Sequence, residues 1–326
     1  MDEVPYLTSD LLTSAEEMEL FGLPASMVIV GGGYVALELG QMFSRFGSEV
    51  TILERNDHVL KHGYEPQVGR VLQEILQDEG VKVLTGANVW RVREEGKGVL
   101  VEMQEGYQVR AERLLVATGR HPNTEGVGLE KAGVKTDGLG QVVVDEYLKT
   151  SVSHIFAAGD VIGAQTANQM ATPVGAHDGK IAAENAFVES EEEMRAVDHS
   201  VVPRAIFTDP QVGLVGLTEE EAIARGHRCW CRTIPMELVP RAGAIRDTRG
   251  IIKMVADADT DRVLGVSMVG TNAAEVIHEA AMGLRFGATI DDFVDMLHVY
   301  PTTAEALKIA AISRRKDPAK LPCCAE

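Results

Sequence analysis

A glycine-rich turn near residue 31 constrains the fold of this chain more than any other feature of its sequence. Met27–Val30 is a short apolar run rich in β-branched residues, which is typical of a buried parallel strand. Gly31-Gly32-Gly33 follows it, a helical pattern continues to Phe46, and Ser48–Glu54 has the composition of the next strand. The order strand, glycine turn, helix and strand is a βαβ unit, which predicts a parallel sheet with helices packed against it.

The spacing inside this turn indicates a ligand. It contains Gly31-x-Gly33-x-x-Ala36, with Gly40 four residues later, and the acid Glu54 ends the next strand 23 positions after Gly31. In that context the motif predicts a dinucleotide site. Gly31 permits the tight turn, Gly33 lets a pyrophosphate approach the start of the helix, and Ala36 and Gly40 allow close packing on the strand. A glycine turn without a ligand is the alternative.

Glu54 bears on which dinucleotide would bind. Its carboxylate stands where it would accept hydrogen bonds from the hydroxyls of the adenosine ribose, and it would repel a 2′-phosphate there. We therefore expect NADH to be preferred over NADPH. Arg55 weakens this expectation because it could turn inward and pair with a phosphate, although a solvated surface side chain is the simpler interpretation.

The rest of the chain shows two further patterns. A helix is expected over Gln67–Asp78, and the strands after it include a three-stranded meander: Val81–Leu84, Val89–Glu94, Gly98–Gln104, Tyr107–Glu112 and Arg113–Ala117. Ile155–Ala158 has the composition of another strand, and Gly175–Val188 that of a helix. From about Val201 strands and helices mix as in an α+β domain. We expect an α/β Rossmann-like, three-layer nucleotide-binding domain followed by an α+β domain.

Within that α+β region, the expected strands are Arg204–Thr208, Val212–Gly216, Cys229–Ile234, Gly250–Asp257 and Val263–Val269. The expected helices are Thr218–Arg225, Ala273–Phe286, Ile290–Met296 and Thr302–Ser313.

Composition excludes several classes of protein. The 49 acidic and 31 basic side chains give a net charge of -18, which opposes nucleic-acid binding because phosphate contacts need a basic surface. No apolar stretch is long enough to predict a membrane span, and Met1–Pro5 lacks the basic and apolar regions of a signal peptide. Four cysteines are too few for a disulfide scaffold, so the expected location is cytoplasmic.

Three motifs, in this order, carry a resemblance to a known family: Gly31–Gly40, Ala117–Asn123 and Ala157–Asp160. The series resembles the flavin-dependent pyridine nucleotide–disulfide oxidoreductases over essentially the whole chain. The resemblance implies that the first motif binds the nicotinamide cofactor. It also implies that Gly119 marks the return into an FAD domain and that Asp160 lies on the ribityl–phosphate side of FAD.

The same resemblance implies roles for two residues of the first motif. Tyr34 would be the ring that gates the nicotinamide pocket, and Glu38 would pair with a lysine near the flavin. The simpler alternatives are helix packing for Tyr34 and an exposed helix charge for Glu38.

His298–Glu305 lies over a signature of the family's dimerisation domain. In disulfide reductases of this family a histidine before the proline moves a proton between the substrate thiol and the redox cysteine, but here that residue is Tyr300. A phenol with a pKa of about 10 is a poor base at neutral pH, whereas its oxygen can orient or ligate a metal ion. Glu305 stands at the place of the acid that orients the missing histidine. This departure argues against a thiol or disulfide substrate.

The adjacent pair Cys323-Cys324, close to the end of the sequence, resembles the ending of mercuric reductases. Hg(II) is a soft ion that prefers thiolates, and two accessible thiolates can take it up and pass it on by exchange. Tyr6 matches a tyrosine that in those enzymes helps to hold the inner Hg(II). The alternatives are a fortuitous cysteine pair and a tyrosine packed in a linker.

Cys229-Trp230-Cys231 places two thiols on one face of a predicted strand, where they could bind a soft metal. Such cysteines are more often small buried hydrophobic residues, and we expect them to belong to the core.

Two elements of the family are missing from this sequence, namely a first GxGxxG turn for FAD and a CxxxxC redox pair. We therefore expect the C-terminal two-thirds of a catalytic core. The predicted division is 1–23 as the end of the first FAD segment, 24–113 as the NAD(P)-binding domain, 114–198 as the second FAD segment, 199–313 as the dimerisation domain, and 314–326 as a mobile tail.

In the complete enzyme, the resemblance implies reduction of Hg(II) to Hg(0) by NAD(P)H through FAD, in a homodimer joined by the C-terminal domain. Cys323 and Cys324 would deliver the ion, and Tyr300 and Tyr6 would help to position it. We expect this chain alone to bind NAD(H) and dimerise without holding FAD firmly or turning over mercury. A dihydrolipoamide dehydrogenase-like enzyme and a dimerising NAD(H)- or metal-binding fragment without catalysis are the alternatives.

Overall fold

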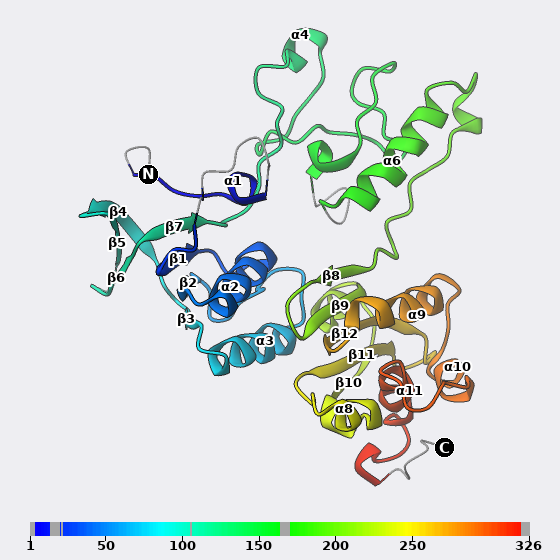
Figure 1. Cartoon of the computed structure of the whole chain (residues 1–326). Coiled ribbons are helices and arrows are strands. Elements are labelled where there is room, and N and C mark those ends of the chain that lie inside the picture. The colour runs from blue at the N-terminus through cyan, green and yellow to red at the C-terminus, as the bar shows by residue number, and fades with distance from the viewer. Residues whose placement is uncertain (1–3, 14–19, 21, 105, 164–169, 321–326) are drawn as a thin grey trace. The chain divides into compact units, whose positions relative to one another are not determined.

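The computed structural model describes the chain except for residues 1–3, 14–19, 21, 105, 164–169 and 321–326. The chain separates into two compact units (Figure 1). The first combines Met1–Gly119 with Pro203–Glu326, and the second is Arg120–Val202. This division is coarser than the five segments expected above, whose boundaries stay a prediction.

A four-stranded parallel sheet forms one half of the first unit. Its strands are β1 (Ser26–Val30), β2 (Glu49–Leu53), β3 (Lys82–Leu84) and β7 (Arg113–Val116), in the order β3-β2-β1-β7. Leu7, which precedes α1 (Ser9–Thr13), extends the pairing by a parallel bridge to Leu115 of β7. The βαβ unit expected from the glycine turn is therefore present.

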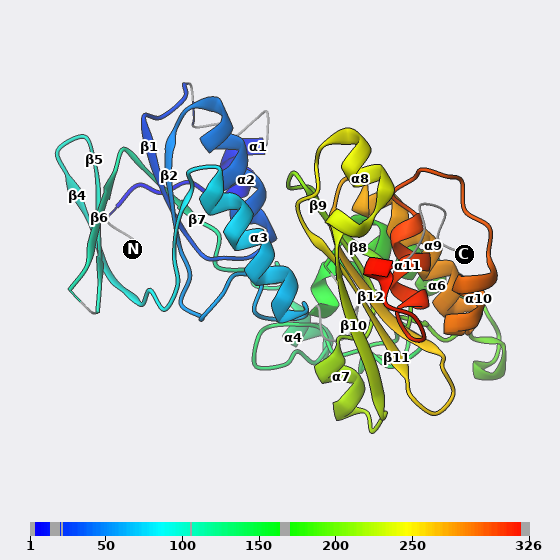
Figure 2. The ribbon, with the colours of Figure 1, turned by 90° about the horizontal axis from the view of Figure 1, so that it is seen from below.

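The two faces of β1 explain why the sheet is covered on both sides. Successive side chains of a strand point to opposite faces. Met27 and Ile29 pack in the cluster that contains the helices α2 (Tyr34–Phe46) and α3 (Pro66–Asp78). Val28 and Val30 pack instead with the meander β4 (Val89–Glu95), β5 (Gly98–Met103) and β6 (Gln108–Ala111). Figure 2 shows this meander and the helices on opposite sides of the sheet, which makes three layers.

The other half of the first unit is an antiparallel sheet with helices. Its strand order is β10-β11-β12-β9-β8. The strands are β8 (Arg204–Ile206), β9 (Gln211–Gly216), β10 (Cys229–Pro235), β11 (Ile251–Asp257) and β12 (Val263–Gly270). The helices are α7 (Glu219–Ala224), α8 (Pro240–Ile245), α9 (Ala273–Arg285), α10 (Ile290–Asp295) and α11 (Glu305–Ile312). The expected fold class, an α/β Rossmann-like domain followed by an α+β domain, is confirmed.

One helix of this half was not predicted. The sequence of α8 begins with Pro240 and contains Gly243, so its composition indicates a turn rather than a helix. Proline is nevertheless compatible with the first position of a helix, and burial of Ala242 gives this short segment a packing face.

A single apolar core joins the two halves of the first unit. Ile29 and Ile52 of the parallel sheet belong to the same buried cluster as Leu214 and Val269 of the antiparallel sheet. Because side chains from both sheets share this core, the two halves of the first unit are packed as one body.

A buried ion cluster crosses the same junction. Lys253 of β11 lies 2.7 Å from Glu65, the residue that precedes α3, and 2.6 Å from Glu219 of α7. The side chains of Lys253 and Glu65 are 3% and 2% exposed. Burial opposes the charge of the lysine, but its hydrogen bonds to Glu219 and Glu65 outweigh this and raise the pKa of Lys253. Removing one partner of such a pair typically costs about 3–5 kcal/mol.

The second unit contains α4 (Leu129–Ala132), a 3-10 turn at Gly159–Ile162 and α6 (Thr172–Asn185) around its own apolar core. The strand expected at Ile155–Ala158 is wrong. Phe156 makes only an isolated bridge to Lys149, and the backbone then turns at Gly159. A strand needs a neighbouring strand over several residues, and among the described residues of this unit the segment finds only that bridge.

No helix among the described residues is both long and apolar enough to cross a membrane.

Candidate functional site

The glycine turn lies at the carboxyl edge of the parallel sheet. The N–H of Gly31 donates to the carbonyl of Leu53 at the end of β2, and the N–H of Ala117 donates to that of Val30. Gly31 has φ +114°, and a Cβ atom there would lie 2.3 Å from the carbonyl oxygen of Ala117. Only glycine fits this position, because a side chain would meet both a strained backbone and the neighbouring strand.

Gly33 plays a different part in the same turn. It precedes α2 with an extended backbone, and no side chain caps the helix there. A Cβ atom at Gly33 would have no atom within 4 Å, so the space in front of the helix start is open. The free N–H groups and the positive end of the helix dipole make this a suitable place for a phosphate.

Ala36 and Gly40 bring α2 close to the sheet. Ala36 is fully buried, and a Cβ atom at Gly40 would lie 3.0 Å from Ile52 and 3.3 Å from Ile29. These contacts match the packing role that the motif gives to the two residues.

Glu54 is buried directly beneath the turn. Its Oε1 accepts hydrogen bonds from the backbone N–H of Asn56 at 2.7 Å and from Nδ2 of Asn56 at 2.5 Å. Its Oε2 would lie 2.5 Å from a Cβ atom on Gly32. Arg55 is exposed. Asn56 and Gly32 therefore help to shape the site, and neither role was predicted from the sequence.

A polar stripe on α2 continues from this turn. Tyr34, Glu38, Gln41 and Arg45 are spaced by four, three and four residues and so share one face of the helix. Tyr34, at the first position of the helix, is 36% exposed, so its ring is accessible to a ligand. Glu38 is half-buried and accepts a 2.7 Å hydrogen bond from the N–H of Phe207, and burial raises the pKa of Glu38. The lysine partner expected for Glu38 stays a prediction.

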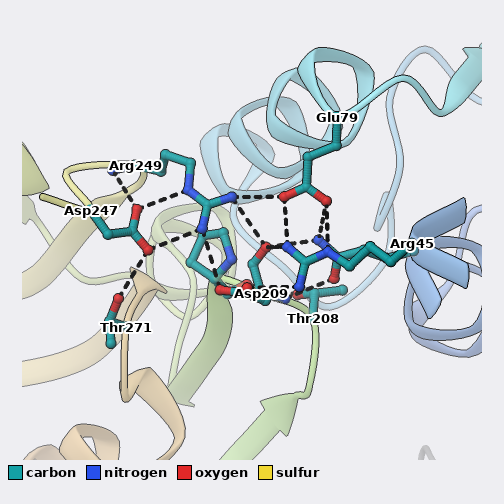
Figure 3. A network of polar contacts seen from close by, with 9 residues as sticks. Arg45, Glu79, Thr208, Asp209, Asp247, Arg249 and Thr271 are labelled. Atoms are coloured by element: carbon teal, nitrogen blue, oxygen red, sulfur yellow. Dashed lines mark hydrogen bonds and ion pairs between the residues drawn. The ribbon is translucent and has the colours of Figure 1, made fainter.

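The far end of the stripe is fixed by ion pairs (Figure 3). Arg45 lies 2.7 Å from both Glu79 and Asp209. Arg249 lies 2.7 Å from Glu79, 3.3 Å from Asp209 and 2.8 Å from Asp247. The hydrogen bond from Arg249 lowers the pKa of Asp247. Exposed pairs contribute little one by one, but this connected set attaches α2 and α3 to the antiparallel half.

Tyr300 lies in the segment between α10 and α11, and its side chain is 47% exposed. Glu305 begins α11 and is buried, and its Oε2 accepts a 3.0 Å hydrogen bond from the N–H of Thr302. In this chain the carboxylate of Glu305 thus holds the backbone two residues after Tyr300.

His298 anchors the other side of that segment, a role that its motif did not predict because its partner Glu279 is 19 positions away in the sequence. Its Nε2 lies 2.9 Å from Glu279 of α9, and its Nδ1 lies 3.2 Å from the carbonyl of Met296. The side chain of His298 is 4% exposed, whereas Leu297 and Val299 are 90% and 77% exposed. The hydrogen bond to Glu279 raises the pKa of His298. The sequence signal that could have indicated this role was the position of His298 two residues before Tyr300.

Of the predicted metal ligands, Tyr6 is 40% exposed, and Cys323 and Cys324 lie outside the described residues. In the described part of the chain, no group of three or more His, Cys, Asp or Glu side chains could hold a metal ion.

The residues predicted to face FAD are found in both units. Gly119 has φ +133°, and a Cβ atom there would have no atom within 4 Å, so its surroundings are open. In the second unit, the half-exposed carboxylate of Asp160 lies 3.7 Å from Arg120. The contact of either residue with FAD stays a prediction.

Cys229 and Cys231 are partly exposed and lie outside the buried core, so the expectation that they belong to the core is wrong. They belong to β10, the edge strand of the antiparallel sheet, which leaves their face only partly covered.

Comparison with known proteins assigns the two halves to one family. Residues 4–179 match the profile described as pyridine nucleotide-disulphide oxidoreductase, and residues 202–311 match the dimerisation domain of the same group. The chain belongs to the pyridine nucleotide-disulphide oxidoreductase family. Its members that match most extensively here include mercuric reductases, which confirms the resemblance seen in the sequence.

The mercuric reductase of Staphylococcus aureus is 40% identical over 328 residues, covering 100% of this chain and 58% of that protein. That of Streptomyces lividans is 42% identical, covering 100% of this chain and 66% of that protein. The dihydrolipoyl dehydrogenase of Haloferax volcanii is 36% identical, covering 92% of this chain and 62% of that protein. The chain thus spans about half to two thirds of the length of these curated relatives.

Among solved structures, the Cu(II) complex of the HOCl-induced flavoprotein disulfide reductase RclA from Escherichia coli matches with a TM-score of 0.82 and 31% identity. The match covers 94% of this chain and 68% of that structure. The fold of this family member therefore agrees with that of a flavoprotein disulfide reductase.

Proposed function

We propose that this chain provides the nicotinamide-binding and dimerisation parts of a mercuric reductase, which reduces Hg(II) to Hg(0) with NAD(P)H. The observation that carries the proposal is Tyr300 at the position of the family's histidine, in a chain about 40% identical to mercuric reductases over its full length. FAD, when bound, supplies the electron transfer between the nicotinamide and the metal. We also propose a cytoplasmic location.

The dinucleotide would bind along the carboxyl edge of the parallel sheet. Its pyrophosphate would lie at the open start of α2, where Gly33 leaves room and the helix N–H groups are free to donate. Tyr34, in the first turn of the same helix, would cover the nicotinamide. This arrangement uses the backbone for the charged part of the ligand and a ring for its reactive part.

We propose that NADH is preferred over NADPH. Asn56 holds one oxygen of the Glu54 carboxylate, so the group cannot turn away from the ribose without losing two hydrogen bonds. A 2′-phosphate would approach this fixed negative charge in a buried setting, where repulsion is strong. Arg55, being exposed, is not held in a position to compensate.

Tyr300 supports a metal substrate over a thiol substrate. A phenol does not exchange protons readily at neutral pH, so it cannot replace the histidine of a disulfide reductase. Its oxygen can contact a bound ion, and the segment that carries it is held on both sides by His298 and Glu305. Cys323 and Cys324 would bring the ion there, with Tyr6 as a further oxygen ligand.

A homodimer is the proposed assembly. Residues 202–311 match the family's dimerisation domain. In that region several apolar side chains are exposed, and a second copy would cover them: Met282 at 58%, Phe286 at 78%, Leu297 at 90% and Val299 at 77%.

A dihydrolipoyl dehydrogenase-like activity is the second candidate, because such enzymes match this chain at 36–38% identity. Dialysis against Hg(II) separates the two candidates. With Cys229 and Cys231 changed to serine in every protein compared, we expect the chain to retain Hg(II) more tightly than a Cys323→Ala/Cys324→Ala variant does, and Tyr300→Phe to weaken retention as well. Equal affinity in all three proteins would remove the metal-handling role and favour the second candidate.

A further inference from the structure

We propose that Cys229 and Cys231 form a second soft-metal site, which binds one Hg(II) between two thiolates. Nothing in this inference depends on Cys323 and Cys324, so the site can exist whether or not the proposed function is correct.

The geometry of β10 brings the two thiols together. Residues two apart on a strand point to the same face, so the side chains of Cys229 and Cys231 are neighbours on one face of β10. Trp230 points to the opposite face, where Arg314 lies 5.4 Å from its ring. Both cysteines are partly exposed, so an ion can reach them from solvent.

The pair is a neutral dithiol at neutral pH. A free cysteine has a pKa of about 8.5, so both sulfurs carry protons. Lys253 of the neighbouring strand β11 could favour a thiolate, but it lies 2.7 Å from Glu65 and 2.6 Å from Glu219, which largely neutralise its charge.

The remaining charged neighbours are already paired. Asp257, which faces Cys229 across the β10–β11 ladder, lies 2.8 Å from His227. Glu65 lies 2.7 Å from Lys253. The thiol pair thus faces a set of carboxylates with little excess positive charge, which is unfavourable for any product that carries a negative charge.

These surroundings favour a metal ion whose complex with the two cysteines carries no net charge. When Hg(II) binds, two S–H bonds break, two S–Hg bonds form and two protons leave, so the neutral dithiol becomes a neutral complex. No net charge is placed in the partly buried site. A monovalent soft ion held by two thiolates would leave a negative complex there, and Zn(II) needs about four ligands, whereas the described residues hold no cluster of three.

The test uses a Cys323→Ala/Cys324→Ala protein, in which the only cysteines are Cys229 and Cys231. Titration with mercuric chloride should give one bound equivalent, an ultraviolet charge-transfer absorption and release of two protons, and the ion should withstand a competing monothiol. Zinc chloride should not bind. Adding Cys229→Ser or Cys231→Ser should leave a single thiol that yields its Hg(II) to the competitor. NADH affinity serves as the folding control for each variant.

A second measurement avoids substitutions altogether. In the unsubstituted protein, mass spectrometry after alkylation should show Cys229 and Cys231 protected together once two equivalents of Hg(II) are present. Independent alkylation of the two residues, release of one proton, or unchanged binding after both serine substitutions would overturn the proposal. If Hg(II) bound at Cys229 and Cys231 but not at Cys323 and Cys324, that result would instead count against the proposed function.

Discussion

The glycine turn before α2 and the Tyr300 segment before α11 are built by different means. In the turn, the backbone itself forms the proposed binding site. Gly31 has no side chain that would clash with the carbonyl of Ala117, and Gly33 leaves an open space in front of α2. In the segment, an exposed ring is held by side chains from elsewhere, with His298 bound to Glu279 and Glu305 bound to Thr302. A backbone site should fail abruptly when a Cβ atom is added, whereas a side-chain site should weaken in steps.

The largest expected effect is that of Gly31→Ala. Its Cβ atom would meet the carbonyl of Ala117 in a backbone conformation that alanine rarely adopts. We expect a loss of about 2–4 kcal/mol in the free energy of unfolding, together with loss of NADH binding. Thermal unfolding and calorimetric titration with NADH measure the two effects.

Gly33→Ala is the matched control, since its Cβ atom would enter open space at an ordinary φ of -81°. We expect stability within about 1 kcal/mol of the original chain but weaker NADH binding, because the methyl group would occupy the place of the pyrophosphate. Equal losses of stability in Gly31→Ala and Gly33→Ala would contradict the conclusion that a side chain is excluded at Gly31 but tolerated at Gly33.

Glu54→Gln should have an intermediate effect, and on binding rather than stability. The substitution removes the negative charge while keeping an oxygen that can accept from Asn56. We expect NADH affinity to fall roughly tenfold, which is about 1.4 kcal/mol, and the preference over NADPH to shrink. Arg55→Ala is the control. If it changed the preference more than Glu54→Gln, the arginine would be the discriminating residue.

His298→Gln should have the smallest effect, and one that depends on pH. Glu279 raises the pKa of His298, so the folded state binds the proton more tightly than the unfolded state. The stabilisation is fully present below the unfolded pKa of about 6.5 and is lost as pH rises through the folded value. We expect a cost of about 1 kcal/mol near pH 6 that shrinks in alkali, measured by urea unfolding across pH.

Glu279→Gln should reproduce that pH dependence, because it removes the other partner of the same pair. A cost that stays constant with pH in both variants would mean that the segment is held by packing rather than by the charged hydrogen bond.

The comparison also explains what could be predicted from sequence. The parallel sheet, the meander, the α+β half and the glycine turn all follow from local patterns, and the structure has them. The roles of Asn56 and Gly32 could not be predicted because the motif does not specify either residue. The role of His298 could not be predicted because its partner Glu279 is 19 positions away on another helix. The stripe on α2 was visible as a helical spacing, but Asp209, which meets Gln41 and Arg45, is more than 160 positions distant.

Cys229 and Cys231 show most clearly what could not be predicted from the sequence. Their spacing predicted a shared face but not its exposure, because that depends on β10 being an edge strand, which only the strand order reveals. Burial in the core was the more frequent outcome for such residues, and it was wrong here.

The most direct test of the account is a calorimetric titration of Hg(II) into a Cys229→Ser/Cys231→Ser protein, whose only thiols are Cys323 and Cys324. We predict one tightly bound ion in the presence of a competing monothiol, and no such binding once both tail cysteines are changed to alanine. Hg(II) affinity that is the same with and without the tail thiols would contradict the assignment to mercury reduction.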